Sequence, residues 1–343
     1  MYLNELNKEK YILIEADNPN YQYSGRVDFE NSKAPTIIYA GSMIKTKFTG
    51  KSLKIAIKNI HACYENAIGF IIDGNITGKV IIEEHNKDIV LDVAEGLSEG
   101  VHDLILFKRS DTAHYFDFYG VILEKGCNLD TPSPKSNRRI ECFGDSVSAG
   151  EVSEAIEYVG KVDPEGHEGI YSNSWYSYSM ITARKLGAEI NNNAQGGIAV
   201  LDGTGYFNPS LGYIGLESTY DKLRYSRELG KCNEWDFSRY TPHVVIMALG
   251  QNDSHPVDYI NDDIEKREYW KNKYKEIILD LRSKYPNALF IIITTLLCHN
   301  EGWDIALDEM TKDINDDKIV RFTVSSSFFI GFKRYAFTPY RIA

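Results

Sequence analysis

The chain has 343 residues, enough for one large domain or two ordinary domains that each bury a core. With 43% hydrophobic and 25% charged residues, its composition is that of a globular protein. The 49 acidic and 38 basic residues give a formal charge of -11. Because nucleic acid binds to basic surfaces, this charge argues against a nucleic-acid partner and suits a neutral ligand such as a sugar polymer.

The sequence lacks the features of a secretory leader or a membrane-spanning helix. No basic segment followed by an apolar one opens the chain, and no apolar run approaches the length of a membrane span. We therefore expect a cytoplasmic protein without a membrane partner, or a secreted one if a leader has been removed, and a homo-oligomer stays open. The cysteines lack zinc-ligand or redox spacing, so we expect reduced thiols at Cys63, Cys127, Cys142, Cys232 and Cys298.

Residues 1–130 are predicted to form an all-β domain. Leu53, Ile55 and Ile57 alternate with polar neighbours, as in a strand with one face in the core and the other in water. Residues 69–75, GFIIDGN, end with an Asp-Gly pair that is typical of a β-hairpin. More strand-like runs follow at intervals of about 8–12 residues, which is typical of sandwiches. We predict an antiparallel sandwich of the jelly-roll type.

The composition of the sequence changes after this domain. Two prolines, Pro132 and Pro134, stand among small polar residues, which is the composition of a linker. We place the linker at residues 131–138 and a second domain at residues 139–343.

The second domain alternates strands with helices. Its strands are apolar throughout, which is typical of a parallel sheet that helices cover on both faces. We therefore predict a doubly wound α/β domain. The expected strands begin at residues 139, 243, 288 and 318, and the expected helices cover residues 173–187, 264–284 and 303–314.

Three segments of this domain follow predicted strands. In a doubly wound sheet, ligand sites gather where the chain leaves the carboxyl ends of the strands. Ser146 lies in FGDSVSAG, where a serine is either a nucleophile or a helix cap. Gly197 lies in NNNAQGGIAV, where paired glycines either offer a backbone N–H to an oxyanion or form a tight turn. Asn252 lies in ALGQNDSHP, where its amide either binds the same oxyanion or makes an Asx turn.

The order of these motifs resembles the SGNH hydrolase family. The chain has Gly-Asp-Ser, then a glycine turn, then Gly-x-Asn-Asp. The resemblance implies that Ser146 attacks an ester carbonyl, and that the N–H groups of Ser146 and Gly197 and the side-chain amide of Asn252 form the oxyanion hole. This assignment agrees with the needs of acyl transfer, which are a nucleophile and donors placed where negative charge develops. We interpret Asp145 and Asp253 as hydrogen-bond acceptors that fix the turns.

A closer resemblance covers almost the whole chain. Residues 171–205 and 235–256, with a β-sandwich before them, are similar to the second family of carbohydrate esterases, the acetyl xylan esterases. The resemblance implies an SGNH-hydrolase sheet preceded by a jelly-roll domain, and removal of acetyl groups from xylan, glucomannan or related polysaccharides. It also implies a Ser–His pair that works without a carboxylate side chain, no metal and no organic cofactor.

The chain departs from this family at the general base. The family's histidine follows the last strand, whereas no histidine follows His299 in this sequence, so we expect a truncated or altered C-terminal loop and helix. His255 and His299 each follow a parallel strand and are candidates for the base, although a histidine bonded only to its own loop is the simpler interpretation. Trp303 and Tyr206 are candidates for contact with a sugar ring, whereas Trp175 is expected to pack in the core.

The sequence thus predicts a serine esterase that deacetylates plant polysaccharides. Because a serine hydroxyl without a base is a poor nucleophile, the alternative is an impaired carbohydrate-binding homologue. A lipase or thioesterase of the same superfamily is a third interpretation.

Overall fold

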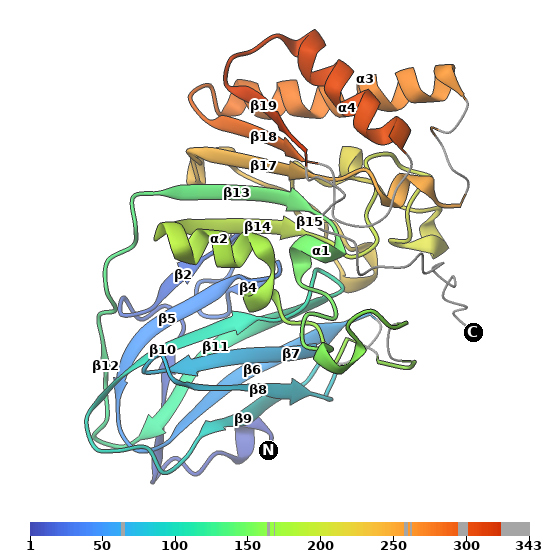
Figure 1. The fold of residues 1–343 in the computed structure, drawn as a ribbon. Helices are drawn as coiled ribbons and strands as arrows, with labels where there is room; N and C mark the ends of the chain where they lie inside the picture. The colour runs from blue at the N-terminus through green and yellow to red at the C-terminus, as the bar shows by residue number, and fades with distance from the viewer. Residues whose placement is uncertain are drawn as a thin grey trace.

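The computed structural model describes residues 1–62, 66–162, 165–167, 169–256, 260, 263–293 and 301–323. Figure 1 shows two bodies, a β-sandwich built by the N-terminal part of the chain and a sheet with helices built by the rest. The predicted fold, a jelly-roll-type sandwich followed by a doubly wound SGNH-type domain, is confirmed. No helix in the described ranges is long and apolar enough to span a bilayer.

The sandwich consists of two antiparallel sheets. One has the order β3-β4-β11-β6-β9, with β1 paired to β11, and the other has the order β12-β5-β10-β7-β8, with β2 paired to β5. The strands of the first sheet are β1 (Tyr11–Glu15), β3 (Val27–Asp28), β4 (Thr36–Ile37), β6 (Leu53–His61), β9 (Asp88–Ala94) and β11 (His114–Glu124). Those of the second are β2 (Gln22–Ser24), β5 (Met43–Thr49), β7 (Asn66–Ile72), β8 (Ile76–Ile82), β10 (Val101–Lys108) and β12 (Leu129–Asp130).

The predicted hairpin is confirmed between β7 and β8. Asp73 and Gly74 both adopt positive φ angles, 52° and 74°, which Asp and Gly tolerate better than most residues. The pair therefore reverses the chain at the point where the sequence predicts a turn.

The expectation that one side of β6 faces water is wrong. Ala56 is fully buried and Lys54 is only 6% exposed, although both point away from the sandwich core. Ala56 packs with Leu6, Val90 and Ile122, so the N-terminal segment covers this side of the sheet. Both faces of β6 therefore contact other parts of the chain, one the sandwich core and the other the N-terminal segment. Alternation in the sequence alone does not distinguish a covered second face from one in water.

The second domain is built on a five-stranded parallel sheet of order β14-β13-β17-β18-β19. Its strands are β13 (Arg139–Gly144), β14 (Glu189–Ala194), β17 (Val244–Ala248), β18 (Leu289–Ile293) and β19 (Ile319–Phe322). Its helices are α1 (Ser146–Ala149), α2 (Tyr178–Leu186), α3 (Ile264–Lys284) and α4 (Glu301–Ile314). A small ribbon of β15 (Lys222–Arg224) and β16 (Asn233–Glu234) lies outside this sheet.

Helices cover both faces of the parallel sheet. Ile246 and Ala248 of β17 pack on the same side as Met180 of α2, whereas the alternate residues Val245 and Met247 pack with α3 and α4. This arrangement explains why β17 is apolar at every position, since a strand with two covered faces has no side in water.

A buried ion pair joins the two bodies. Arg26, just before β3, and Glu141 of β13 are both 0% exposed and lie 3.0 Å apart. Arg26 also donates to the carbonyls of Tyr220 and Lys222, while Glu141 accepts from Asn193. Breaking one side of such a pair leaves a buried charge without its partner, which is more costly than losing a surface ion pair.

We therefore expect Arg26→Met to lower the free energy of unfolding by about 3–5 kcal/mol. The double variant Arg26→Met/Glu141→Gln should recover part of this loss, because a neutral glutamine still accepts from Asn193 and no buried charge is left alone. Denaturant unfolding measures both, with Lys231→Met at the exposed pair to Glu30 as the control. Equal losses in the single and double variants would contradict this account.

Candidate functional site

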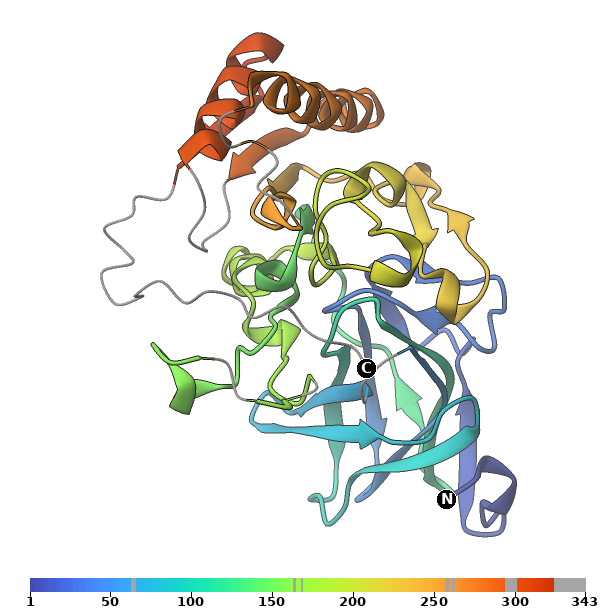
Figure 2. The ribbon, with the colours of Figure 1, turned by 90° about the vertical axis from the view of Figure 1, so that its right-hand side faces the viewer.

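Three loops leave the parallel sheet at one edge. In the strand register, Gly144 at the end of β13 lies beside Ala194 of β14 and Ala248 of β17. The loops that carry Ser146, Gly197 and Asn252 therefore begin side by side. Figure 2 looks onto the side of the molecule toward which these strands point in Figure 1.

Ser146 is the first residue of α1, directly after the turn that follows β13. The Asp145 side chain caps this helix by accepting from the N–H of Val147 at 3.1 Å. At Gly144 a Cβ atom would lie 2.0 Å from Oγ of Ser148, so only glycine fits before the turn. The half-buried Ser146 side chain is thus held at the rim of the sheet by a short, tightly packed turn.

Gly197 occupies a turn that requires glycine. Its φ angle is 72°, and an added Cβ would lie 2.9 Å from Cβ of Tyr206. Its carbonyl accepts from the Tyr206 N–H at 2.7 Å, whereas its own N–H donates to no group in the described part of the chain. That N–H is therefore available to a ligand.

Asn252 lies beside this glycine turn. Its Nδ2 donates to the Ile198 carbonyl at 2.9 Å, which leaves the second amide hydrogen for another acceptor. The predicted oxyanion donors Gly197 and Asn252 therefore lie on adjoining loops, and the Asn252 amide is oriented by the residue that follows Gly197.

Side-chain hydrogen bonds join the loops to one another. Gln251, which precedes Asn252, donates to Asp145 at 2.6 Å and so connects the Ser146 and Asn252 loops. Asp253 accepts from the N–H groups of Val200 and Leu201, and so connects the Asn252 and Gly197 loops. Both aspartates thus fix turns, as the sequence analysis expects, whereas the role of Gln251 was missed although it lies inside the Gly-x-Asn-Asp motif.

Both aspartates are fully buried, which makes their ionisation unfavourable. Burial raises the pKa of Asp145 from 3.8 to about 7, although hydrogen bonds from Val147 and Gln251 oppose the shift. Burial likewise raises the pKa of Asp253 from 3.8 to about 7, against hydrogen bonds from the Val200 and Leu201 N–H groups and from the indole of Trp270. The loops of the site therefore contain two carboxyl groups, Asp145 and Asp253, whose pKa values lie near neutral pH.

His255 lies on the same edge, three residues after Asn252. Its Nδ1 donates to the carbonyl of Gly205 at 2.7 Å, its ring stacks on Tyr206 with a centroid distance of 4.0 Å, and Tyr213 contacts the ring edge-on. Within the described residues, no histidine forms a hydrogen bond with the Ser146 hydroxyl. Tyr206, expected as a sugar contact, supports the His255 ring.

The prediction that Trp303 lines a substrate cleft is wrong. Trp303 belongs to α4, is 0% exposed and packs against Trp270 of α3 with ring centroids 4.9 Å apart. The sequence pattern predicts a helix that begins at this residue, whereas α4 starts two residues earlier and its Trp303 indole packs against α3. His299 and the expected change after the last strand lie outside the described residues.

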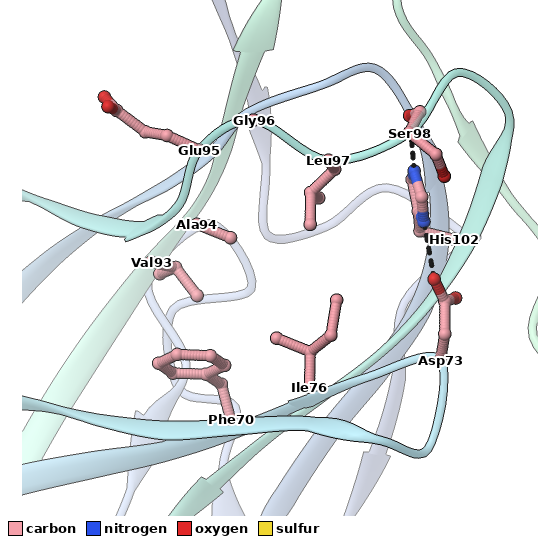
Figure 3. A pocket seen from close by; sticks show the side chains of 10 residues that line it. All are labelled: Phe70, Asp73, Ile76, Val93, Ala94, Glu95, Gly96, Leu97, Ser98 and His102. Atoms are coloured by element: carbon pink, nitrogen blue, oxygen red, sulfur yellow. Dashed lines mark hydrogen bonds and ion pairs between the residues drawn. The ribbon is translucent and has the colours of Figure 1, made fainter.

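A separate hollow of about 460 Å³ lies in the sandwich. Figure 3 shows apolar side chains of β7, β8 and β9 on one side and the His102–Asp73 pair on the other. Both ring nitrogens of His102 are bonded, one to Asp73 at 2.6 Å and one to the Ser98 carbonyl at 3.1 Å. None of its lining residues belongs to the parallel-sheet domain, so this hollow is distinct from the Ser146 edge.

Comparisons with known proteins agree with this architecture. Residues 23–132 match the family model of the carbohydrate esterase 2 N-terminal domain. Over 304 residues the chain is 29% identical to the cellulase/esterase CelE of Acetivibrio thermocellus, covering 88% of this chain but only 34% of that protein. It is also 24% identical over 284 residues to an acetylxylan esterase/glucomannan deacetylase of Cellvibrio japonicus, covering 81% of this chain and 72% of the other.

A solved structure extends the likeness to three dimensions. A family two carbohydrate esterase from Clostridium thermocellum, in complex with cellohexaose, aligns with a TM-score of 0.73 and 27% identity over 90% of each chain. The resemblance of this chain to the family 2 carbohydrate esterases is therefore confirmed.

The raised pKa of Asp145 predicts how stability changes with pH. The folded protein holds the Asp145 proton up to about pH 7, whereas the unfolded chain releases it near 3.8. At Asp145 the folded state therefore binds more protons between these values, and the contribution of this group to stability falls as the pH rises from about 4 to 7. Asp145→Asn should make this fall less steep in unfolding titrations, and the exposed control Asp317→Asn should not; identical slopes in both variants would refute the assignment.

Proposed function

We propose that this chain, a relative of the family 2 carbohydrate esterases, is a serine esterase that removes O-acetyl groups from acetylated xylan or related plant polysaccharides. The observation that carries this proposal is the placement of three groups at one edge of a parallel sheet: a serine hydroxyl, a glycine N–H that donates to no described residue, and an oriented asparagine amide. These are the groups that acyl transfer requires.

In this proposal Ser146 attacks the acetyl carbonyl, its proton passes to the base, and the base returns a proton to the sugar oxygen, which leaves as a hydroxyl group. The carbonyl oxygen becomes an oxyanion, which accepts hydrogen bonds from the N–H groups of Ser146 and Gly197 and from Nδ2 of Asn252. Because the turns hold these donors before substrate arrives, they need not reorganise during the reaction. Water then hydrolyses the acetyl-serine intermediate and releases acetate.

The base assigned in this proposal is His255. A carbonyl can only accept a hydrogen bond, so the contact with Gly205 requires a proton on Nδ1. In the neutral ring Nε2 then carries a lone pair, the form that a general base needs. The Gly205 carbonyl would orient the ring as a carboxylate does in a full triad, which agrees with a Ser–His pair that works without a carboxylate side chain.

An acetylated polysaccharide is the substrate that the sequence and its relatives favour together. The net charge of -11 disfavours a polyanionic ligand, whereas an O-acetyl glycan is neutral. Of the relatives, one is named an acetylxylan esterase/glucomannan deacetylase. The CelE protein is also much longer than this chain, so its cellulase activity is not part of the proposal.

A second candidate function is glycan binding without turnover. The observation that favours it is that the Ser146 hydroxyl makes no hydrogen bond within the described residues. Calorimetric titration with xylo- and cello-oligosaccharides, together with an assay for released acetate, separates the two functions. Binding without acetate release by the unmodified chain would favour this candidate over the esterase.

We expect Ser146→Ala to abolish release of acetate from acetylated xylan and hydrolysis of p-nitrophenyl acetate, because no other group forms the acetyl intermediate. Oligosaccharide affinity should persist, since the substitution removes one oxygen atom. As a matched control, Ser136→Ala in the segment before β13 should keep full activity. Undiminished hydrolysis by Ser146→Ala would exclude the proposed nucleophile.

We expect His255→Ala to lower kcat by a factor of about 10² or more, since general-base catalysis contributes on that order. Conversion of the neighbouring Tyr213 to Phe keeps the ring contact and serves as the control. Steady-state kinetics on p-nitrophenyl acetate measures both variants. If His255→Ala retains wild-type kcat, another group is the base and the assignment of His255 is wrong.

A further inference from the structure

A loop of the sandwich reaches the glycine turn of the site. Residues 109–113 connect β10 to β11, and within them Asp111 is only 2% exposed. One carboxylate oxygen of Asp111 accepts from the Gly196 N–H at 2.8 Å and from Nε2 of Gln195 at 2.7 Å. Its other oxygen accepts from the Ala113 N–H at 3.0 Å, which fixes the carboxylate in its own loop. A sandwich residue is thus bonded directly to the residue before Gly197.

The Gln195 side chain is held from the same loop. Thr112 donates its hydroxyl to Oε1 of Gln195, and the Tyr225 hydroxyl lies 3.3 Å from the same oxygen. The Gln195 backbone N–H donates to the Gly144 carbonyl at 3.0 Å, next to the Ser146 turn. The Gln195 side chain is therefore held by the sandwich, and its backbone is held by β13.

These contacts restrain the peptide group that carries the Gly197 N–H. Asp111 holds the peptide group between Gln195 and Gly196 by accepting from the Gly196 N–H. The Tyr206 N–H holds the next peptide group but one by donating to the Gly197 carbonyl. The peptide between the two glycines lies between these fixed groups, although each glycine alone has wide freedom in φ and ψ. An added Cβ at Gly196 would lie 1.8 Å from Oε1 of Glu151 and 2.7 Å from the Asp111 carboxylate, so two carboxylate side chains crowd this position.

The loop itself is anchored in the sandwich. Lys108 is fully buried and its ammonium group donates to the carbonyls of Ser110 and Asp111. Arg109 next to it pairs with Glu154, which lies in the segment after α1. The carboxylate of Asp111 therefore projects from a backbone that the buried Lys108 ammonium group and the Arg109–Glu154 ion pair hold in place.

We infer that Asp111 is a positioning residue of the oxyanion hole, and that the sandwich contributes this residue to the active site of the proposed esterase. This inference rests on the proposed function. Asp111 acts through the Gly196 peptide and does not touch the substrate. The Gly197 N–H stabilises the oxyanion of the transition state more than it stabilises the carbonyl oxygen of the bound substrate. Loss of its positioning should therefore lower kcat more than it changes KM.

Asp111→Ala, Asp111→Asn and the isosteric Thr112→Val test this inference in the full chain. We expect Asp111→Ala to lower kcat on p-nitrophenyl acetate about 10- to 100-fold with KM within about twofold, because the donor is displaced rather than removed. Asp111→Asn should restore part of kcat, since its carbonyl oxygen can still accept from Gly196 while its amide nitrogen loses the contact with the Ala113 N–H. Thr112→Val, which removes one hydrogen bond to Oε1 of Gln195, should change kcat in the same direction by a smaller factor.

Asp103→Ala on β10 is the matched control, because its side chain is exposed and far along the strand from the loop. It should leave kcat and KM unchanged. Unchanged kcat in both Asp111→Ala and Thr112→Val would overturn the inference. So would equal losses in Asp111→Ala and Asp111→Asn, which would mean that the hydrogen bond to Gly196 is not what matters. If Asp111→Ala does not fold, Thr112→Val and Asp111→Asn decide the question.

Hydrogen exchange separates this inference from the proposed function. If the wild-type chain releases no acetate, the proposed function fails, but the contact of Asp111 with Gly196 can still be tested. Asp111→Ala should then speed amide exchange in peptides that contain residues 195–197 and leave peptides of β7 and β8 unchanged. Equal exchange in the wild type and the variant would overturn the positioning role whatever the activity.

Discussion

The shared register of three parallel strands is the constraint on which the site depends. Gly144 lies beside both Ala194 and Ala248, so the loops after β14, β13 and β17 begin side by side at the same edge of the sheet. A shift of any strand by one residue would turn its side chains to the other face of the sheet and separate these loops. Hydrogen bonds from Gln251 to Asp145 and from Asn252 to Ile198 then hold the loops together above the sheet.

Buried polar contacts join the two bodies of the molecule at β13 and at the turn after β14. Arg26 reaches Glu141 in the middle of β13, and Asp111 reaches the turn after β14. Buried charges and carboxylates are costly without partners, so these contacts favour one relative placement of sandwich and sheet. The sandwich therefore supports the loops at the edge of the parallel sheet directly.

Local patterns in the sequence predict much of this molecule. The apolar stripe of residues 264–284 yields α3 with the same bounds, and Asp73-Gly74 yields the β7–β8 turn. Features that depend on distant contacts were not predictable. Trp303 follows a strand in the sequence, but its side chain is buried because α4 packs against α3. Asp111 lies in a sandwich loop without any motif, and only the packing of the two bodies brings it to Gly196.

In the proposed reaction, one oxygen atom receives hydrogen bonds from all three loops. A crystal structure of the chain after reaction with a small alkyl phosphonate ester tests it most directly, because the adduct resembles the tetrahedral intermediate. We expect an adduct on Ser146 Oγ, with one phosphonyl oxygen about 2.7–3.1 Å from the N–H groups of Ser146 and Gly197 and from Nδ2 of Asn252. An adduct whose oxygen points away from Gly197 and Asn252, or one that forms on another residue, would contradict it.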